Sequence, residues 1–313
     1  MTEAETVVRP AYRPYQVSVV AVQRLSPHFV RVVFSGDDLE HFGTGGLDQR
    51  IKLFLPNIYG QISDFGQDDV ESLGSGEWYS RWRALPVADR SPMRTYTVRR
   101  IDPTARGLTD DFVVHHDAGP AGDWAENVTL GQEIIVVGPD QRSSDSLGGI
   151  DWHPGTARRV LIAGDETAAP AIGSILESLG AEFNADVFIE VPTAADILSI
   201  TTEATARVSW LVRGNRDHGA VLTEAVQAWS NESSSLLERA AAARAQELDD
   251  INVDDEMLWD VPEDVHGEFY AWIAGESALV KGLRRHLVQG RGVDRKRVAF
   301  MGYWRLGQSE RNE

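Results

Sequence analysis

The sequence of 313 residues contains no cysteine. Disulfide bonds, thiolate nucleophiles and cysteine-held iron–sulfur clusters are therefore excluded, and any redox chemistry must come from a bound cofactor. The eight histidines show no H-x-H or HExxH spacing. His115 and His116 are adjacent on an expected strand, so their side chains point to opposite faces and do not easily bind one ion. We expect no metal ion held by the protein.

Long apolar runs are also missing. No stretch approaches the length of a membrane span, and residues 1–15 lack the cationic start and apolar run of a signal peptide. Basic residues are outnumbered, with 30 Lys and Arg against 48 Asp and Glu and a net charge of -18. This charge opposes attraction to nucleic acid and to anionic lipid. The expected protein is cytoplasmic, with no membrane insertion and no nucleic-acid partner.

The first half of the chain is rich in short runs of β-branched and aromatic residues. Six runs lie between turn residues, at 15–25, 29–36, 50–56, 94–101, 111–116 and 132–139. Short strands at this spacing predict a six-stranded antiparallel β-barrel. Residues 60–77, which separate the third and fourth runs, are rich in Gly, Ser and acidic residues and predict a loop.

The second half alternates strands with helices, which predicts a parallel α/β layer. We expect strands at 158–166, 185–192, 206–214, 268–276 and 295–304, and helices at 167–180, 220–229 and 277–292. An acidic insertion around 230–260 interrupts this pattern, and its segment 233–250 has helix-forming composition. A Gly- and Pro-rich segment at 148–158 predicts the domain boundary, giving a barrel domain at 1–155 and an α/β domain at 156–313.

The octamer MRTYTVRR, residues 93–100, carries three arginines within an expected strand. Because strand side chains alternate, Arg94 and Tyr96 share one face. A planar cation beside an aromatic ring, followed by the Thr97 hydroxyl, suits a ligand that is both aromatic and anionic. A solvated edge strand, whose charges only maintain solubility, would explain the same residues.

Four small residues, Gly119, Pro120, Ala121 and Gly122, stand before an expected helix. Backbone N–H groups at a helix start carry partial positive charge and suit a pyrophosphate. The alternative is an ordinary Gly-Pro turn in which Asp123 caps the helix.

Two expected strands of the second half end in polar turns. The stretch GDETAAPAI, residues 164–172, places Asp165, Glu166 and Thr167 between a buried strand and a helix, and Ala274, Gly275 and Glu276 end a later strand. Ligands of open α/β sheets bind at the carboxyl ends of strands, so the two turns can frame one nucleotide. Each turn can also be a capped βα turn without a ligand, and neither contains GxGxxG.

The last expected strand ends in Tyr303 and Trp304, followed by Arg305. Aromatic residues at such a position serve either as core or as a lid on a cofactor.

Together these stretches resemble the siderophore-interacting protein family, flavin-dependent ferric-siderophore reductases related to the ferredoxin reductases. The resemblance runs from about residue 15 to residue 308 and rests on R-x-Y-T, GPA, GDETAAPAI, and GE followed by MGYWRLG. It implies FAD as cofactor, NADH or NADPH as electron donor, and a ferric siderophore as substrate from which Fe(II) is released for iron assimilation.

The resemblance also implies roles for residues of the barrel. Arg94 would pair with the FAD pyrophosphate, Tyr96 would lie against the isoalloxazine, and Thr97 would hydrogen-bond the flavin near its reactive nitrogen. The second FAD segment would comprise His115, Gly119, Pro120, Ala121, Gly122 and Trp124. Gly122 stands where a serine is common in the family.

On the nicotinamide side, the implied residues are Asp165, Glu166, Thr167, Ala274, Gly275, Glu276, Tyr303 and Trp304. Lys52 resembles the family's basic residue near the flavin, and with Thr97 and Arg305 it completes the expected catalytic set. Glu190, which ends an expected strand, predicts a preference for NADH, although Arg213 and Arg216 could reverse it.

Other functions fit part of this pattern. A general flavin reductase or a ferredoxin-linked electron-transfer protein would also need a flavin, and ferredoxin is a possible donor. A siderophore-binding module without catalytic activity would need neither a pyrophosphate site nor an α/β domain.

Overall fold

The computed structural model describes residues 9–114, 119–248, 258–262 and 265–307. They form two compact units, one made of residues 9–24 and 29–150 and the other of 25–28 and 151–307. No helix in these ranges combines the length and apolar character that crossing a membrane requires.

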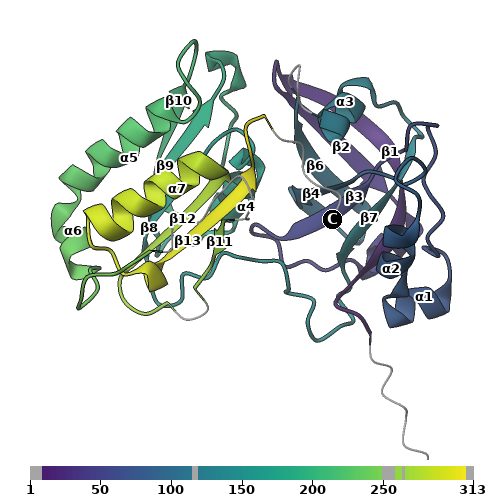
Figure 1. Ribbon diagram of the computed structural model, residues 1–313, viewed down its shortest axis with the longest axis horizontal. Coiled ribbons are helices and arrows are strands. Elements are labelled where there is room, and N and C mark those ends of the chain that lie inside the picture. The colour runs from purple at the N-terminus through teal and green to yellow at the C-terminus, as the bar shows by residue number, and fades with distance from the viewer. Residues whose placement is uncertain (1–8, 115–118, 249–257, 263–264, 308–313) are drawn as a thin grey trace, which may run out of the picture. The chain divides into compact units, whose positions relative to one another are not determined.

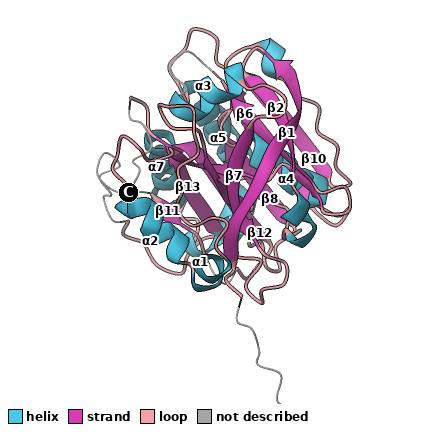
Figure 2. Ribbon diagram, turned by 90° about the vertical axis from the view of Figure 1, so that its right-hand side faces the viewer, coloured by secondary structure: helices cyan, strands magenta, loops and turns pink. Residues whose placement is uncertain are grey.

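The first unit is built on an antiparallel sheet with the order β4-β3-β7-β1-β2-β6-β5. Its longest strand, β1 (Tyr12–Ser26), is visible in Figure 2. The other strands are β2 (Phe29–Ser35), β3 (Arg50–Phe54), β4 (Met93–Thr97), β5 (Arg100–Asp102), β6 (Gly107–Val113) and β7 (Glu133–Pro139).

The two edge strands of this sheet, β4 and β5, are consecutive in the sequence. Val98 and Arg99 join them: the Val98 N–H donates to the carbonyl oxygen of Gln49 (3.0 Å), and the Arg99 N–H to that of Thr109 (3.1 Å). The run 93–102 therefore pairs first with β3 and then with β6, which closes the sheet on itself. The predicted antiparallel barrel is confirmed, with its fourth expected strand divided into β4 and β5.

The interior of the barrel is filled by every second side chain of its strands, as strand alternation requires. Fully buried members of this core are Val32, Phe34, Leu53, Leu108, Phe112 and Val136. The helix α3 (Gly119–Asn127) covers part of this core through Ala121 and Ala125.

The predicted loop at 60–77 is partly wrong, because it contains helix α1 (Val70–Ser75). Helix α2 (Glu77–Ala84) begins at its last residue. Trp78 and Trp82 of α2 pack against Phe54 of β3, with ring centroids 6.2 and 5.3 Å apart. Two tryptophans four residues apart lie on one helix face, so apolar burial stabilises this short helix.

The second unit has a sheet with the order β10-β9-β8-β12-β13-β11, parallel except for β11, as predicted. Its strands are β8 (Arg159–Gly164), β9 (Asn184–Val191), β10 (Thr205–Val212), β11 (Trp259–Asp260), β12 (Phe269–Glu276) and β13 (Val298–Trp304). Its helices are α4 (Ala169–Ser178), α5 (Ala220–Glu232), α6 (Ser234–Arg239) and α7 (Ser277–Arg285), the last followed by a π-helical turn at His286–Gly290.

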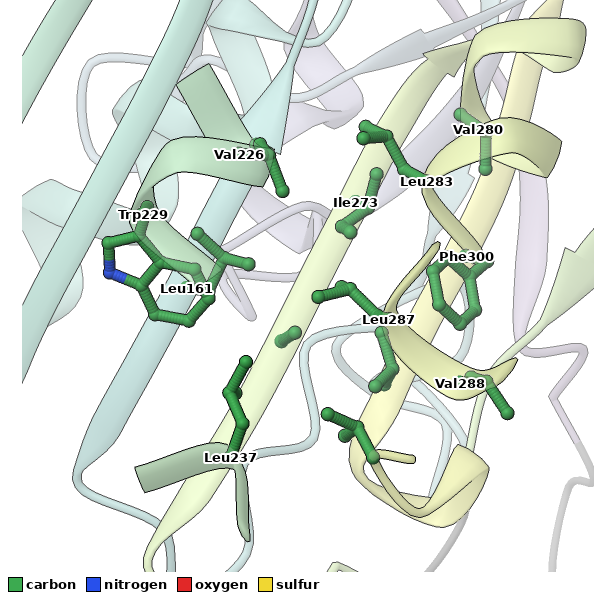
Figure 3. Close-up of a cluster of buried hydrophobic side chains, with 14 of the residues drawn as sticks. Leu161, Val226, Trp229, Leu237, Ile273, Val280, Leu283, Leu287, Val288 and Phe300 are labelled. Atoms are coloured by element: carbon green, nitrogen blue, oxygen red, sulfur yellow. The ribbon is translucent and has the colours of Figure 1, made fainter. Parts of the chain in front are cut away.

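Helices α5 and α7 cover one face of this sheet (Figure 1). Figure 3 shows Leu161, Ile273 and Phe300 of the strands packed against Val226 and Leu283 of the two helices. Helix α4 lies on the other face. It comes so close to β8 that a Cβ at Gly164 would meet Ala168 at 2.5 Å, which explains a glycine there.

The helix expected at 233–250 is confined to the six residues of α6. Beyond it, Ala241 forms a β-bridge with Val293, and the Gln246 amide donates to the Val293 carbonyl oxygen (2.8 Å). These tertiary pairings override the helix propensity of the segment. Residues 249–257 and 263–264 of the acidic insertion lie outside the described ranges.

Candidate functional site

In the first unit, the ladder between β3 and β4 decides which way the expected cofactor residues face. Arg94 pairs with Leu53 and Tyr96 with Ile51, and both partners belong to the barrel core. Directly opposed residues of an antiparallel pair project to the same side. Arg94 and Tyr96 therefore share the core side, as the sequence predicts.

The opposite side of the same ladder carries the other expected residues. Lys52 is paired with Thr95, and its Nζ donates to the Thr95 Oγ1 over 2.5 Å. Thr97 stands on the same side, two residues further along β4, directly across from Arg50. We call this side, defined by Arg50, Lys52, Thr95 and Thr97, the outer face.

An aromatic row extends from β4 to α3. The Tyr96 ring lies 4.6 Å from Phe112, Phe112 lies 5.4 Å from Trp124, and Trp124 stacks on Phe34 at 6.1 Å. The indole N–H of Trp124 is buried and has no hydrogen-bond partner within the described part of the chain. The structure thus brings Tyr96 and Trp124, 28 residues apart in sequence, into one row.

Helix α3 begins earlier than expected. Gly119, with φ 67°, is its first residue, and the small residues through Gly122 form its first turn instead of preceding it. Asp123 lies inside the helix, so the alternative in which it caps the helix is wrong. The positive φ at residue 119 favours glycine. His115 lies outside the described residues.

In the second unit, the chain reverses its winding direction between β8 and β12. These strands are adjacent and parallel, with Gly164 opposite Ala274 at their carboxyl ends. Open α/β sheets bind ligands at such a switch point. Both polar turns singled out in the sequence therefore meet at one edge of the sheet.

Asp165 ties these strand ends together. Its buried carboxylate accepts hydrogen bonds from the Thr167 N–H (2.9 Å) and hydroxyl (2.5 Å), from the Glu276 N–H (2.7 Å) and from the Trp304 indole (3.0 Å). A Cβ on Gly275 would meet its Oδ2 at 2.6 Å, so only glycine permits this approach. Both carboxylate oxygens of Asp165 are thus hydrogen-bonded within the protein, and neither is available to a ligand.

Glu166 is held in a similar way. Arg213 donates to both of its oxygens (2.9 and 2.8 Å) and also to Glu190 (3.0 Å). Burial alone would raise the pKa of Glu166, but the nearby His218 and the hydrogen bonds from Arg213 lower it to about 2. The carboxylate is therefore charged, and its charge is matched inside the protein.

The expectation about Glu190 is wrong in its physical basis. The residue is fully buried, and its carboxylate accepts the N–H groups of Gly219 (2.7 Å) and Leu222 (3.1 Å) at the start of α5, besides Arg213. A carboxylate neutralised in this way neither contacts a ribose nor repels a phosphate. Arg216 pairs with Glu224 at the surface.

A cavity of about 600 Å³ opens beside this edge. It is lined by His218, Gly219, Ala220, Thr223, Glu224, Glu276, Ala278, Leu279, Arg305 and Leu306. Among the residues predicted from sequence, Glu276 and Arg305 reach it. Asp165, Glu166 and Thr167 are not among its lining residues.

His218 is the lining residue that sequence reasoning missed. Its Nε2 lies 3.5 Å from Asp165 and 3.7 Å from Glu166, and its ring meets Trp304 edge-on at 5.0 Å. Burial lowers the pKa of His218, but the carboxylates of Glu166 and Asp165 outweigh this and raise it overall. Its place after β10, at the carboxyl edge of the sheet, was the available signal.

The two C-terminal aromatic residues differ in surroundings. Tyr303 stacks on Trp259 (5.8 Å) and meets Trp272 edge-on (6.3 Å), so it packs within the sheet. Trp304 donates to Asp165, and its carbonyl oxygen accepts from the Ser277 hydroxyl (2.9 Å). Of the pair, Trp304 belongs to the switch-point edge.

The chain is similar over nearly its whole length to bacterial proteins that include two reductases of ferric chelates. It is 32% identical over 306 residues to an uncharacterized protein of Mycobacterium tuberculosis, covering 96% of this chain and 93% of that protein. It is 26% identical to the ferric vibriobactin reductase ViuB of Vibrio cholerae (95% and 91% covered). It is 27% identical to the NADPH-dependent ferric-chelate reductase of Escherichia coli (95% of each).

Solved structures agree with this placement. A siderophore utilization protein from T. fusca superposes with a TM-score of 0.67 at 28% identity, over 97% of each chain. A ferredoxin reductase of carbazole 1,9a-dioxygenase, at 16% identity and a TM-score of 0.57, covers 94% of this chain and 71% of its own, and shares the fold.

Two family signatures divide the chain. Residues 18–143 match the siderophore-interacting FAD-binding domain, and residues 157–307 match the siderophore-interacting protein domain. With both halves matched, and with the full-length likeness above, the chain belongs to the siderophore-interacting protein family.

Proposed function

We propose that this protein is an FAD-dependent reductase that passes electrons from NAD(P)H to a ferric siderophore and so releases Fe(II). The observation that carries the proposal is that the two sides of the β3–β4 ladder carry different polar side chains. One side offers a cation and a ring, Arg94 and Tyr96, and the other offers Lys52 and Thr97. The named activities of the Vibrio cholerae and Escherichia coli relatives support the same reaction.

The residues present fit FAD. Arg94 is a nearly buried cation, Tyr96 and Trp124 belong to one aromatic row, and the first turn of α3 carries small side chains. The orphaned indole N–H of Trp124 adds a donor. Such a surface suits a ligand with aromatic rings and a pyrophosphate.

When FAD is bound, Arg94 and the start of α3 would hold the pyrophosphate, Tyr96 would position the ring system, and Thr97 would donate or accept a hydrogen bond to it. FAD supplies the exchange between a two-electron donor and a one-electron acceptor. Iron is released because Fe(II) is a softer ion than Fe(III), and oxygen chelators hold it poorly. Lys52 attracts an anionic chelate despite the negative charge of the whole protein.

The nicotinamide donor would bind at the switch-point edge of the second unit. Asp165 and Glu166 act there as positioning residues that fix Thr167, Glu276, Trp304 and His218. Since Glu190 is neutralised internally, the case for NADH falls away, and the NADPH dependence named for the Escherichia coli relative makes NADPH the donor we expect.

An anaerobic absorbance series tests the proposal. FAD-loaded protein receives NADPH or NADH, and then a ferric siderophore together with a ferrous-iron trap. We expect the flavin absorbance to bleach with NADPH and to return as the ferrous complex forms.

Other outcomes would replace the proposal. Flavin that neither nicotinamide bleaches would point to a ferredoxin donor. Bleached flavin that returns faster with free flavin than with the chelate would indicate a general flavin reductase. Siderophore binding without any ferrous product would leave a binding module.

A further inference from the structure

The segment 213–219, which joins β10 to α5, brings two arginines and a histidine to the neighbourhood of the cavity. Arg213 donates to two buried carboxylates (2.8–3.0 Å), and Arg216 is paired with Glu224. His218 lines the cavity itself. The two arginines are therefore engaged in ion pairs within the protein, and the histidine is the basic residue of this segment that a ligand in the cavity would meet.

The backbone beside His218 is held firmly. Gly219 has a φ of 77°, and a Cβ there would meet the Leu279 side chain of α7 at 2.8 Å, so the position requires glycine. The Gly219 N–H also donates to the buried carboxylate of Glu190 (2.7 Å). These contacts fix the position of His218 next to the start of α7.

The two nitrogens of the His218 ring have different surroundings. Nε2 is buried and lies 3.5 Å from Asp165 and 3.7 Å from Glu166. Because 11% of the side chain is exposed and the residue lines the cavity, Nδ1 is the nitrogen that remains for a ligand. Burial lowers the pKa of His218, and Arg213 adds to this, but the two carboxylates outweigh them and raise the pKa overall. In the protonated ring Nδ1 is a charged donor.

The other charged groups at the cavity come from β12, α5 and the end of β13. The oxygens of Glu276 accept backbone N–H groups (2.9 and 3.3 Å), and Glu224 is paired with Arg216. Arg305 and Thr223 add a guanidinium and a hydroxyl to the same lining. Since the carboxylates of the lining have partners within the protein, the cavity can accept an anionic group despite them.

We propose that His218 binds the 2′-phosphate of NADPH through its Nδ1–H and so distinguishes NADPH from NADH. This inference rests on the proposed function. In dinucleotide-binding folds an acidic residue that ends the second strand contacts the ribose 2′-hydroxyl. Glu190 ends β9 in the corresponding place, but its carboxylate bonds to Gly219, the neighbour of His218. His218 thus lies beside the expected ribose, where a charged donor suits a phosphate oxygen.

A histidine makes this recognition depend on pH, which an arginine would not. Protonated His218 binds the phosphate, and its affinity is lost as the pH rises through the pKa of the ring. Arg305 keeps its charge throughout, so any contribution it makes stays constant. A phosphate with a second pKa of about 6 is mostly dianionic above about pH 6.5. The preference for NADPH over NADH should therefore decrease with rising pH.

The test measures binding of NADP⁺ and NAD⁺, which cannot donate a hydride, to FAD-loaded protein between pH 6.5 and pH 9 by titration calorimetry. Adenosine 2′,5′-bisphosphate and ADP are the second pair, and they distinguish the 2′-phosphate from the pyrophosphate. Wild type is compared with His218→Gln and His218→Lys. His266→Gln is the matched control, because His266 is exposed just before the amino end of β12, at the opposite edge of the sheet.

We expect His218→Gln to weaken binding of NADP⁺ and of adenosine 2′,5′-bisphosphate about tenfold at pH 6.5, and to leave NAD⁺ and ADP at the wild-type level. Wild type should lose the same factor as the pH rises to 9. His218→Lys should keep the preference across this range, because a lysine stays charged to about pH 10. His266→Gln should match wild type at each pH.

The outcomes separate this inference from the proposed function. Equal losses for NADP⁺ and NAD⁺ in His218→Gln, or an NADP⁺ affinity of wild type that does not fall with pH, overturns the role of His218 even if NADPH bleaches the flavin. The pH series uses wild type alone, so it decides the matter even if a variant does not fold. A pH-dependent preference for NADP⁺ that requires His218, in a protein that reduces no ferric siderophore, supports His218 and overturns the reductase.

Discussion

The two candidate sites of this protein are built in opposite ways. On the β3–β4 ladder of the first unit, the residues that the sequence singles out, Arg94, Tyr96 and Lys52, lie on strand faces at positions set by register alone. At the switch point of the second unit, the acidic side chains are hydrogen-bonded within the protein: Asp165 by Thr167 and by the ends of β12 and β13, and Glu166 by Arg213. Strand register alone decides where the polar side chains of a ladder lie, whereas a turn at a strand end uses its polar side chains for its own hydrogen bonds.

The first prediction concerns Arg94 on the β3–β4 ladder. We expect Arg94→Ala to weaken FAD binding about 100-fold, because a charge-assisted hydrogen bond to the pyrophosphate is lost. Titration of flavin-free protein with FAD measures the change, and flavin content after desalting confirms it. Arg100→Ala on β5, an exposed arginine of the same run, is the control and should retain FAD. Equal retention by both variants would remove Arg94 from the site.

The second prediction tests the switch point. Asp165→Ala leaves the Glu276 N–H, the Trp304 indole and the Thr167 N–H without their acceptor, so we expect a loss of about 3 kcal/mol in the free energy of unfolding. Urea unfolding measures it, with the exposed Glu182→Ala as a control that stays within about 0.5 kcal/mol of wild type. Wild-type stability combined with lost NADPH binding would instead make Asp165 a direct ligand.

The third prediction concerns an exception in the first unit. Asp110 is fully buried between Leu108 and Phe112 on β6, and its carboxyl oxygens have no hydrogen-bond partner within the described ranges. Burial raises its pKa well above the usual 3.8, and the charge of Asp111 raises it further. Buried carboxylates are usually paired with a cation or hydrogen-bonded, so the surroundings of Asp110 are unusual.

The sign of the effect follows from this raised pKa. Below pH 3.8 Asp110 is protonated in both the folded and the unfolded state and makes no pH-dependent contribution, and the folded state loses stability as the pH rises from there through the folded pKa. Asp110→Asn removes that loss, so its stability relative to wild type should increase with pH, by at most about 1.4 kcal/mol per unit. Urea unfolding at pH 5 and pH 8 measures the difference. A difference that does not change with pH would mean that Asp110 does not titrate in this range.

The sequence predicts the framework of both units well. Alternation of β-branched residues locates the barrel strands, and the change to strand–helix alternation locates the α/β layer. Local pattern also suffices for the shared side of Arg94 and Tyr96, because it depends only on strand periodicity. The lining of the second site could not be found this way, because it depends on which strand ends become neighbours.

Three particular residues show where local reading fails. Glu190 ends its strand as an acidic ribose ligand would, but tertiary contacts with Arg213 and the start of α5 consume its charge. No local motif marks His218, because it is the order of the strands in the sheet that brings this residue to the site. Tyr303 and Trp304 are neighbours in sequence, yet strand alternation turns one toward Trp259 and the other toward Asp165.

The run 93–102 is both the proposed FAD-binding strand and the seam at which the barrel closes, through the amides of Val98 and Arg99. A ligand held by Arg94 and Tyr96 would therefore stabilise the seam by mass action, since it binds only the closed arrangement. Flavin binding and closure of the barrel are therefore thermodynamically linked. Hydrogen exchange at the Val98 and Arg99 amides should slow when FAD is added, and loss of flavin should be the first step by which this unit opens.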